Sequence, residues 1–98
     1  MNINVNKNEN SCELNIEGVI KSVSDSQSIK DAFNSCGNIK SVSIEIIDSF
    51  SITSSVIGFL LKKKHGDGIN INIKVNDSRI YELFQSLNLI EVLNVKKA

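Results

Sequence analysis

Three segments of this chain alternate apolar and polar residues, and this pattern constrains the fold more than any other feature. They are residues 12–17 (CELNIE), 41–47 (SVSIEII) and 69–75 (ININIKV). Successive side chains of a strand point to opposite faces, so strict alternation indicates a strand that is buried on one face only. Strands covered by helices on both faces are apolar on both. We therefore expect helices mainly on one face of the sheet.

Helical patterns separate these segments, with apolar residues spaced three and four positions apart. They lie in residues 24–37, 48–66 and 76–88, and shorter alternating segments lie at 3–6 (INVN) and 90–95 (IEVLNV). Gly37 is typical of a helix end, and Asp77 of an N-cap. The order β-β-α-β-α-β-α-β predicts a single α/β domain over residues 1–98 with some parallel pairing. We expect a small mixed sheet of four to five strands.

Charge and hydropathy exclude several classes of partner. The chain has 98 residues with eleven basic and eleven acidic side chains, which gives a formal net charge of zero. A nucleic-acid surface or a polybasic membrane anchor would need a basic excess. The longest apolar run, VIGFLL, is too short to cross a bilayer, and the first ten residues contain no apolar core of a secretion signal. We expect a cytoplasmic protein that neither binds nucleic acid nor inserts into a membrane.

The two cysteines, Cys12 and Cys36, fit no CxxC pattern. In the cytoplasm thiols are kept reduced, so we expect two reduced, partly buried thiols. A disulfide between them is the less favoured alternative.

Signatures of enzymes are scarce in this sequence. His65 is the single histidine, and it lies where a helix is expected to end. A histidine there caps carbonyls or is solvated, and no acid or base is spaced to assist it. No His or Cys pair has metal-ligand spacing, and the GDG at 66–68 lacks the GK[ST] of a phosphate loop. We expect no catalytic activity, no metal and no cofactor.

The segment 48–66 (DSFSITSSVIGFLLKKKHG) has two interpretations that share one geometry. In the first, Thr53 or Ser54 is the N-cap of a helix, whose side-chain oxygen accepts a first-turn N–H. In the second, a serine there is a switch. A phosphoryl group would meet free N–H donors and the positive end of the helix dipole, and it would add nearly two negative charges.

The arrangement of these pieces resembles the STAS domain family, which includes the anti-sigma-factor antagonists. The resemblance covers residues 10–95. The family has an Asp-Ser-Ser-Gly-Leu-Gly type segment, which corresponds here to residues 53–58 (TSSVIG), with Thr53 and Val56 in place of the family's Asp and first Gly. Gly18 fits the glycine that closes the second strand, and residues 74–95 resemble the C-terminal helix and last strand.

The resemblance implies a non-enzymatic regulatory module that binds a protein partner, which is both a serine kinase and an anti-sigma factor. Phosphorylation of Ser54, with Ser55 as second choice, would release the partner. The implied docking surface consists of Asp48, Ser49, Phe50, Ser51, Thr53, Ser54, Ser55 and Val56.

STAS domains also occur in membrane-lipid ABC transport complexes. The alternative function is therefore a subunit that contacts the nucleotide-binding ATPase through the same helix start, without phosphorylation. A third, weaker alternative is a module that binds another ligand through its open sheet face or first helix.

Overall fold

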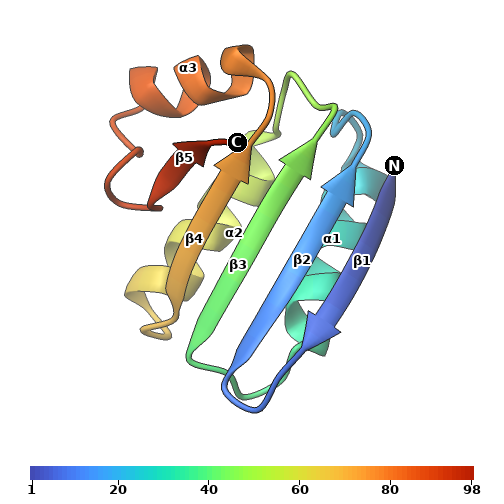
Figure 1. Ribbon diagram of the computed structural model, residues 1–98, viewed down its shortest axis with the longest axis vertical. Coiled ribbons are helices and arrows are strands. Elements are labelled where there is room, and N and C mark those ends of the chain that lie inside the picture. Colours follow the sequence, from blue (N-terminus) through green and yellow to red (C-terminus); the bar gives the residue numbers. More distant parts are fainter.

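The computed structural model describes residues 1–98 and contains the predicted elements in the predicted order (Figure 1). The elements are β1 (Asn2–Lys7), β2 (Ser11–Glu17), α1 (Val23–Ser35), β3 (Ser41–Ile47), α2 (Ser54–His65), β4 (Asn70–Val75), α3 (Ser78–Ser86) and β5 (Val95–Lys97). The fold is a small α/β structure with a mixed sheet of five strands, as expected.

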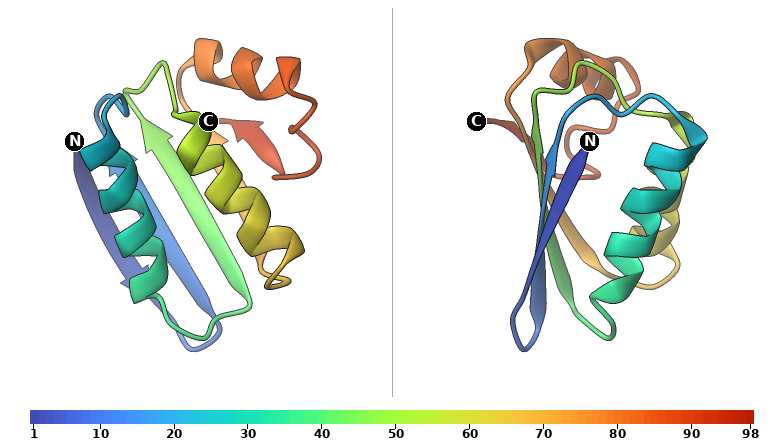
Figure 2. Two further views of the ribbon diagram at one scale, coloured as in Figure 1. Left: turned by 180° about the vertical axis from the view of Figure 1, so that it is seen from behind. Right: turned by 90° about the vertical axis from the view of Figure 1, so that its right-hand side faces the viewer.

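The five strands lie in the sheet in the order in which they occur in the chain. β1 pairs with β2 in antiparallel orientation, and β2, β3, β4 and β5 pair in parallel. Helices α1 and α2 are the crossovers between successive parallel strands. Because such crossovers are right-handed and the sheet grows in one direction, both helices are placed on the same face. Figure 2 shows α1 and α2 on one side of the sheet and no helix covering the other.

The alternating residues of the central strands behave as predicted. The apolar positions of β2, β3 and β4 are buried, whereas the intervening positions are exposed or half-buried. The helices contribute Ile29, Phe33, Val56, Leu60, Ile80 and Phe84 to the same core. The core thus lies between the sheet and the helices, and the polar face of the sheet is left open.

Two helices are capped at their N-termini by local hydrogen bonds from residue types that favour such caps. At α1, the Ser22 hydroxyl accepts the Asp25 N–H at 3.0 Å, and the Asp25 carboxylate accepts the Ser22 N–H at 3.2 Å. This reciprocal capping box starts the helix at Val23, one residue before the predicted segment. At α3 the predicted N-cap is confirmed, because the Asp77 carboxylate accepts the Arg79 N–H at 2.8 Å.

The last strand is shorter than predicted. Of the segment 90–95, only Val95 belongs to β5. The preceding residues form turns, in which the Leu93 N–H donates to the Leu89 carbonyl and the Val95 N–H to the Ile90 carbonyl. Asn94 has a φ of 50°, which strand residues do not adopt. The apolar side chains around Asn94 therefore belong to a turn that leads the chain from α3 back to the sheet.

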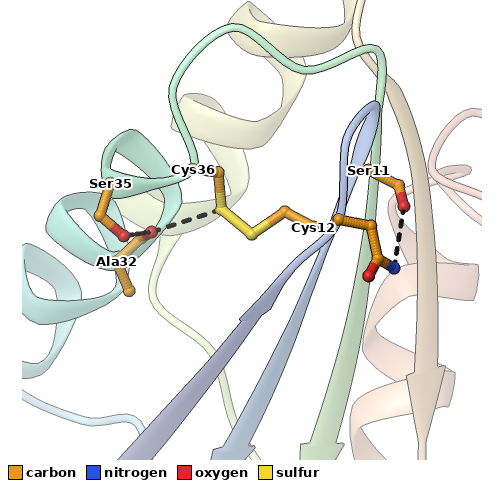
Figure 3. The surroundings of a disulfide bond; sticks show 6 residues. Ser11, Cys12, Ala32, Ser35 and Cys36 are labelled. Atoms are coloured by element: carbon orange, nitrogen blue, oxygen red, sulfur yellow. Dashed lines mark hydrogen bonds between the residues drawn. A yellow bond between two sulfur atoms is a disulfide. The ribbon is translucent and has the colours of Figure 1, made fainter.

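Cys12 and Cys36 form a disulfide, so the expectation of two reduced thiols is wrong. Figure 3 shows Cys36 at the end of α1 joined to Cys12 on β2. The helix crosses the sheet so that its last turn lies over the start of β2, and the two Cα atoms are 6.0 Å apart. That separation lies within the range of disulfides. Both residues are buried in the core.

Candidate functional site

The segment that carries the STAS resemblance lies at one end of the sheet. The parallel strands all end at the same end of the sheet, and the loop after β3 leads from there into α2. Figure 1 shows this loop, residues 48–53, at the same end of the molecule as residues 18–22, which lead from β2 into α1. The candidate site is therefore formed by two loops and two helix starts that are far apart in the sequence.

Hydrogen bonds fasten the loop before α2 to the loop before α1. The Ser49 hydroxyl accepts the Ile20 N–H at 3.2 Å and donates to the Ser51 carbonyl at 2.8 Å. The Ser51 hydroxyl donates to the Ile20 carbonyl at 3.1 Å. Asp48, at the start of this loop, has a φ of 58°, a left-handed conformation that Asp adopts more readily than most residues. The loop is thus held in place by its own serines.

Thr53 is the N-cap of α2, which decides between the two capping candidates. Its hydroxyl accepts the Val56 N–H at 3.2 Å, and its carbonyl accepts the Ile57 N–H at 3.2 Å. Ser54 is the first residue of the helix and is exposed. The N–H groups of Ser54 and Ser55 precede the first intrahelical bond, so they remain available to an acceptor outside the helix.

Side chains of α1 contact the start of α2 directly. The hydroxyls of Ser26 and Thr53 are 2.7 Å apart, and the Lys30 ammonium donates to the Ser55 hydroxyl at 2.6 Å. A small pocket of ≈ 180 Å³ lies between the two helix starts, and Lys21 and Lys30 are its two charged lining residues. This pocket contains two cations and no acidic side chain.

The predicted contact residues differ in how accessible they are. Asp48, Phe50, Ser54 and Ser55 are exposed, Ser51 and Thr53 are half-buried, and Ser49 and Val56 are buried. The last two side chains do not lie on the surface. Ser49 is held inside the loop by its hydrogen bonds, and Val56 packs into the core beneath the first turn of α2.

A scan of this sequence against protein-family models finds no match, and a search of curated proteins finds no significant match. The STAS resemblance therefore rests on the residues quoted above and stays a hypothesis.

The start of α3 supports the exposed ring of Phe50. The Arg79 guanidinium lies over this ring, 4.8 Å from its centroid. Arg79 also forms an ion pair with Asp77 at 2.7 Å. Hydrogen bonds from the Arg79 side chain and backbone N–H lower the pKa of Asp77 from 3.8 to about 2. The carboxylate thus stays charged and holds the guanidinium in place.

The sequence pattern did not single out the residues of α1 that border this site. They are Lys21 and Ser22 directly before the helix, and Val23, Ser26, Gln27 and Lys30 within it. Their local pattern is that of an ordinary helix start, and only the crossover topology brings them beside α2. In two parallel β-α units with right-handed crossovers, both helices begin at the carboxyl ends of the strands. This rule is the signal that would have predicted the α1 residues of the site.

Other parts of the molecule offer little chemistry. His65 is exposed at the end of α2. No group of three His, Cys, Asp or Glu side chains is placed to hold a metal ion. No helix is both long and apolar enough to cross a membrane.

Proposed function

We propose that this chain is a non-enzymatic, cytoplasmic interaction module whose docking surface surrounds the start of α2 and is switched by phosphorylation of Ser54. The partner that the STAS resemblance implies is a serine kinase that also acts as an anti-sigma factor. The observation that carries the proposal is the exposed Ser54 hydroxyl on the first turn of a twelve-residue helix, beside a pocket with two lysines.

The modification follows ordinary phosphoryl-transfer chemistry. The kinase transfers the γ-phosphoryl group of ATP to Ser54 Oγ, and ADP and the hydroxyl proton are released. The phosphoserine then carries nearly two negative charges at neutral pH. The free N–H groups and the positive end of the α2 dipole favour that charge. Lys30, which now donates to Ser55, and Lys21 supply cations at the same pocket.

Exposed apolar side chains support a protein partner for the unmodified form. Val23 at the start of α1 is 88% exposed, and Phe50 in the loop before α2 is 48% exposed. A partner that covers Val23 also covers Ser54, because both residues line the same pocket. A phosphate buried in that interface would lose its hydration and repel acidic groups of the partner, so the complex would dissociate.

The disulfide bears on the cytoplasmic part of this proposal. Cytoplasmic thiols are kept reduced, whereas oxidising compartments preserve disulfides. The proposal therefore requires that the start of α2 keeps its structure when Cys12 and Cys36 are reduced. The site and the disulfide are at opposite ends of α1, since the site borders its first turns and Cys36 follows its last residue. This separation favours an independent site.

Mass spectrometry of the protein isolated from its own cells tests the modification. We expect a single phosphate on Ser54 under at least one growth condition, and none in Ser54→Ala. Absence of phosphate from Ser54 under every condition, together with no transfer from ATP in lysate, would count against the switch. Phosphate on Ser55 alone would move the switch to the second-choice residue.

Affinity capture with charge-mimicking variants tests the docking surface. Wild type and Ser54→Asp are compared with Ser78→Asp, which adds the same charge at the first residue of α3. We expect a kinase-like partner that is captured by wild type and Ser78→Asp and lost with Ser54→Asp. Capture of an ABC-type ATPase equally by all three proteins would replace the switch with the transport-subunit alternative.

A further inference from the structure

The two edges of the sheet differ in how well they are protected against pairing with another strand. The β5 edge is three residues long, and two of these residues are lysines, Lys96 and Lys97. Short length and lysine are common protections of an edge strand. The β1 edge is six residues long and carries one charge, Lys7, at its end. It has no proline, and its register with β2 runs without a bulge.

The hydrogen-bonding phase of β1 determines which backbone groups face outward. The Asn8 N–H donates to the Ser11 carbonyl at 2.8 Å, so residues 8 and 11 form a hydrogen-bonded pair. Hydrogen-bonded and non-bonded pairs alternate along an antiparallel ladder. The backbone groups of Ile3, Val5 and Lys7 therefore point away from β2, toward the open edge.

A groove runs beside this edge, between β1 and α1. It has a volume of ≈ 450 Å³, and its apolar lining includes Ile3, Val5 and Ala32. Val5 is 40% exposed there. Two acidic side chains of α1, Asp25 and Asp31, also line the groove. Figure 2 shows α1 alongside β1 at this edge of the molecule. Met1 also lines the groove, and its N-terminal amine acts on Asp25. The groove thus presents an apolar floor and a rim with two carboxylates against one cation, next to unpaired backbone groups.

We propose that a second copy of this chain pairs with the β1 edge, strand β1 against strand β1, in antiparallel orientation. The register that matches all outward groups places Val5 opposite Val5 of the second copy and Ile3 opposite its Lys7. Every one of these pairs is then a hydrogen-bonded pair that exchanges both N–H···O bonds. The two sheets join into one, and a two-fold axis passes beside Val5.

Charge complementarity identifies a second copy as the occupant. Ile3, Val5 and Lys7 share the helix-side face of β1, since they lie opposite the buried Ile16, Leu14 and Cys12 of β2. In the proposed register, Lys7 of each copy extends over Ile3 of the other. It then lies in the groove whose rim holds Asp25 and Asp31. The strand therefore brings its own cation to its partner's acidic groove.

Sedimentation velocity of the full chain over a range of concentrations tests this dimer. We expect wild type to form a dimer and Val5→Lys to raise its Kd about tenfold or more, because two like charges would face each other across the axis. Asn4→Lys is the matched control, since it adds the same charge to the opposite face of β1. A wild type that stays monomeric at every concentration would overturn the proposal, including the case in which the edge binds a peptide of another protein.

A charge exchange provides the second test. Lys7→Glu places an acid against the acidic rim and is expected to weaken the dimer. Asp31→Lys combined with Lys7→Glu restores the opposite charges and is expected to recover dimerisation; Asp31 is chosen because Asp25 caps α1. Circular dichroism of each variant establishes that it is folded. A dimer that is equally stable in all these variants would use another surface and would overturn the proposal.

Discussion

The hydroxyl oxygens of Ser26 and Thr53 are 2.7 Å apart, and this contact joins the starts of α1 and α2. Ser26 also donates to the Ser22 carbonyl at 3.1 Å. The Thr53 proton is therefore the one shared with Ser26, and the Thr53 oxygen remains free to accept the Val56 N–H. One hydroxyl thus caps α2 and connects it to α1, directly before Ser54.

Thr53→Ala should destabilise the protein by about 1–2 kcal/mol, because it removes an N-cap and a partly buried hydrogen bond. Thr53→Ser keeps the hydroxyl and should recover most of this loss. The measurement is the free energy of unfolding in urea. If Thr53→Ala unfolds at the same urea concentration as wild type, the cap and its link to Ser26 contribute nothing.

Reduction of the disulfide should destabilise the protein by about 3 kcal/mol, since Cys12 and Cys36 are 24 residues apart and their bond restricts the unfolded chain. Urea unfolding with and without dithiothreitol measures this loss. The double variant Cys12→Ala/Cys36→Ala is the control, because it should not respond to the reductant. A wild-type stability that is independent of reductant would contradict the expectation.

The stability of the protein should fall in acid partly because of Asp77. Its pKa is lowered to about 2 in the folded state from an ordinary value of 3.8. The folded state therefore favours the charged carboxylate. This contribution is complete above the unfolded pKa and is lost as the pH falls from about 4 to about 2.

Asp77→Asn should reduce this slope while it preserves an N-cap, because Asn caps helices as well as Asp. Unfolding curves measured at several pH values test the prediction. Asp25, whose pKa is lowered by the N–H groups of Lys21 and Ser22, contributes with the same sign and should maintain part of the slope. An unchanged slope in Asp77→Asn would show that the Arg79 interaction is not coupled to folding.

Two glycines should respond to alanine in opposite ways. Gly58 lies within α2, and a Cβ there would meet nothing within 4 Å, so Gly58→Ala should stabilise the protein by about 0.5–1 kcal/mol. Gly18 has a φ of 104°, and a Cβ there would lie 3.1 Å from the Met1 Cα. Gly18→Ala should destabilise the protein. Thermal unfolding of both variants tests the pair; a stabilised Gly18→Ala would contradict the strain at that turn.

Local pattern was enough to predict most of the secondary structure. The alternation around Leu14, Ile44 and Ile73 predicts both the strands and the open polar face. In a strand, adjacent residues point to opposite faces, so the apolar positions identify the buried face. The first turn of α2 was likewise expected from its hydroxyl residues. The predicted start of the last strand was wrong. Alternating apolar residues around Asn94 are also compatible with a turn that packs on the core.

Only the tertiary structure decided which distant residues meet. The sequence by itself determined a strand at Cys12 and a helix ending near Cys36, but the angle at which α1 crosses the sheet decided that they bond. In the same way, Ser54 was singled out by its place at a helix start. Only the packing of α1 beside α2 placed Ser26 against Thr53 and Lys30 against Ser55, its neighbours. Periodicity indicates which face of each helix or strand is buried. Which residues of different elements touch depends on how the elements pack against one another.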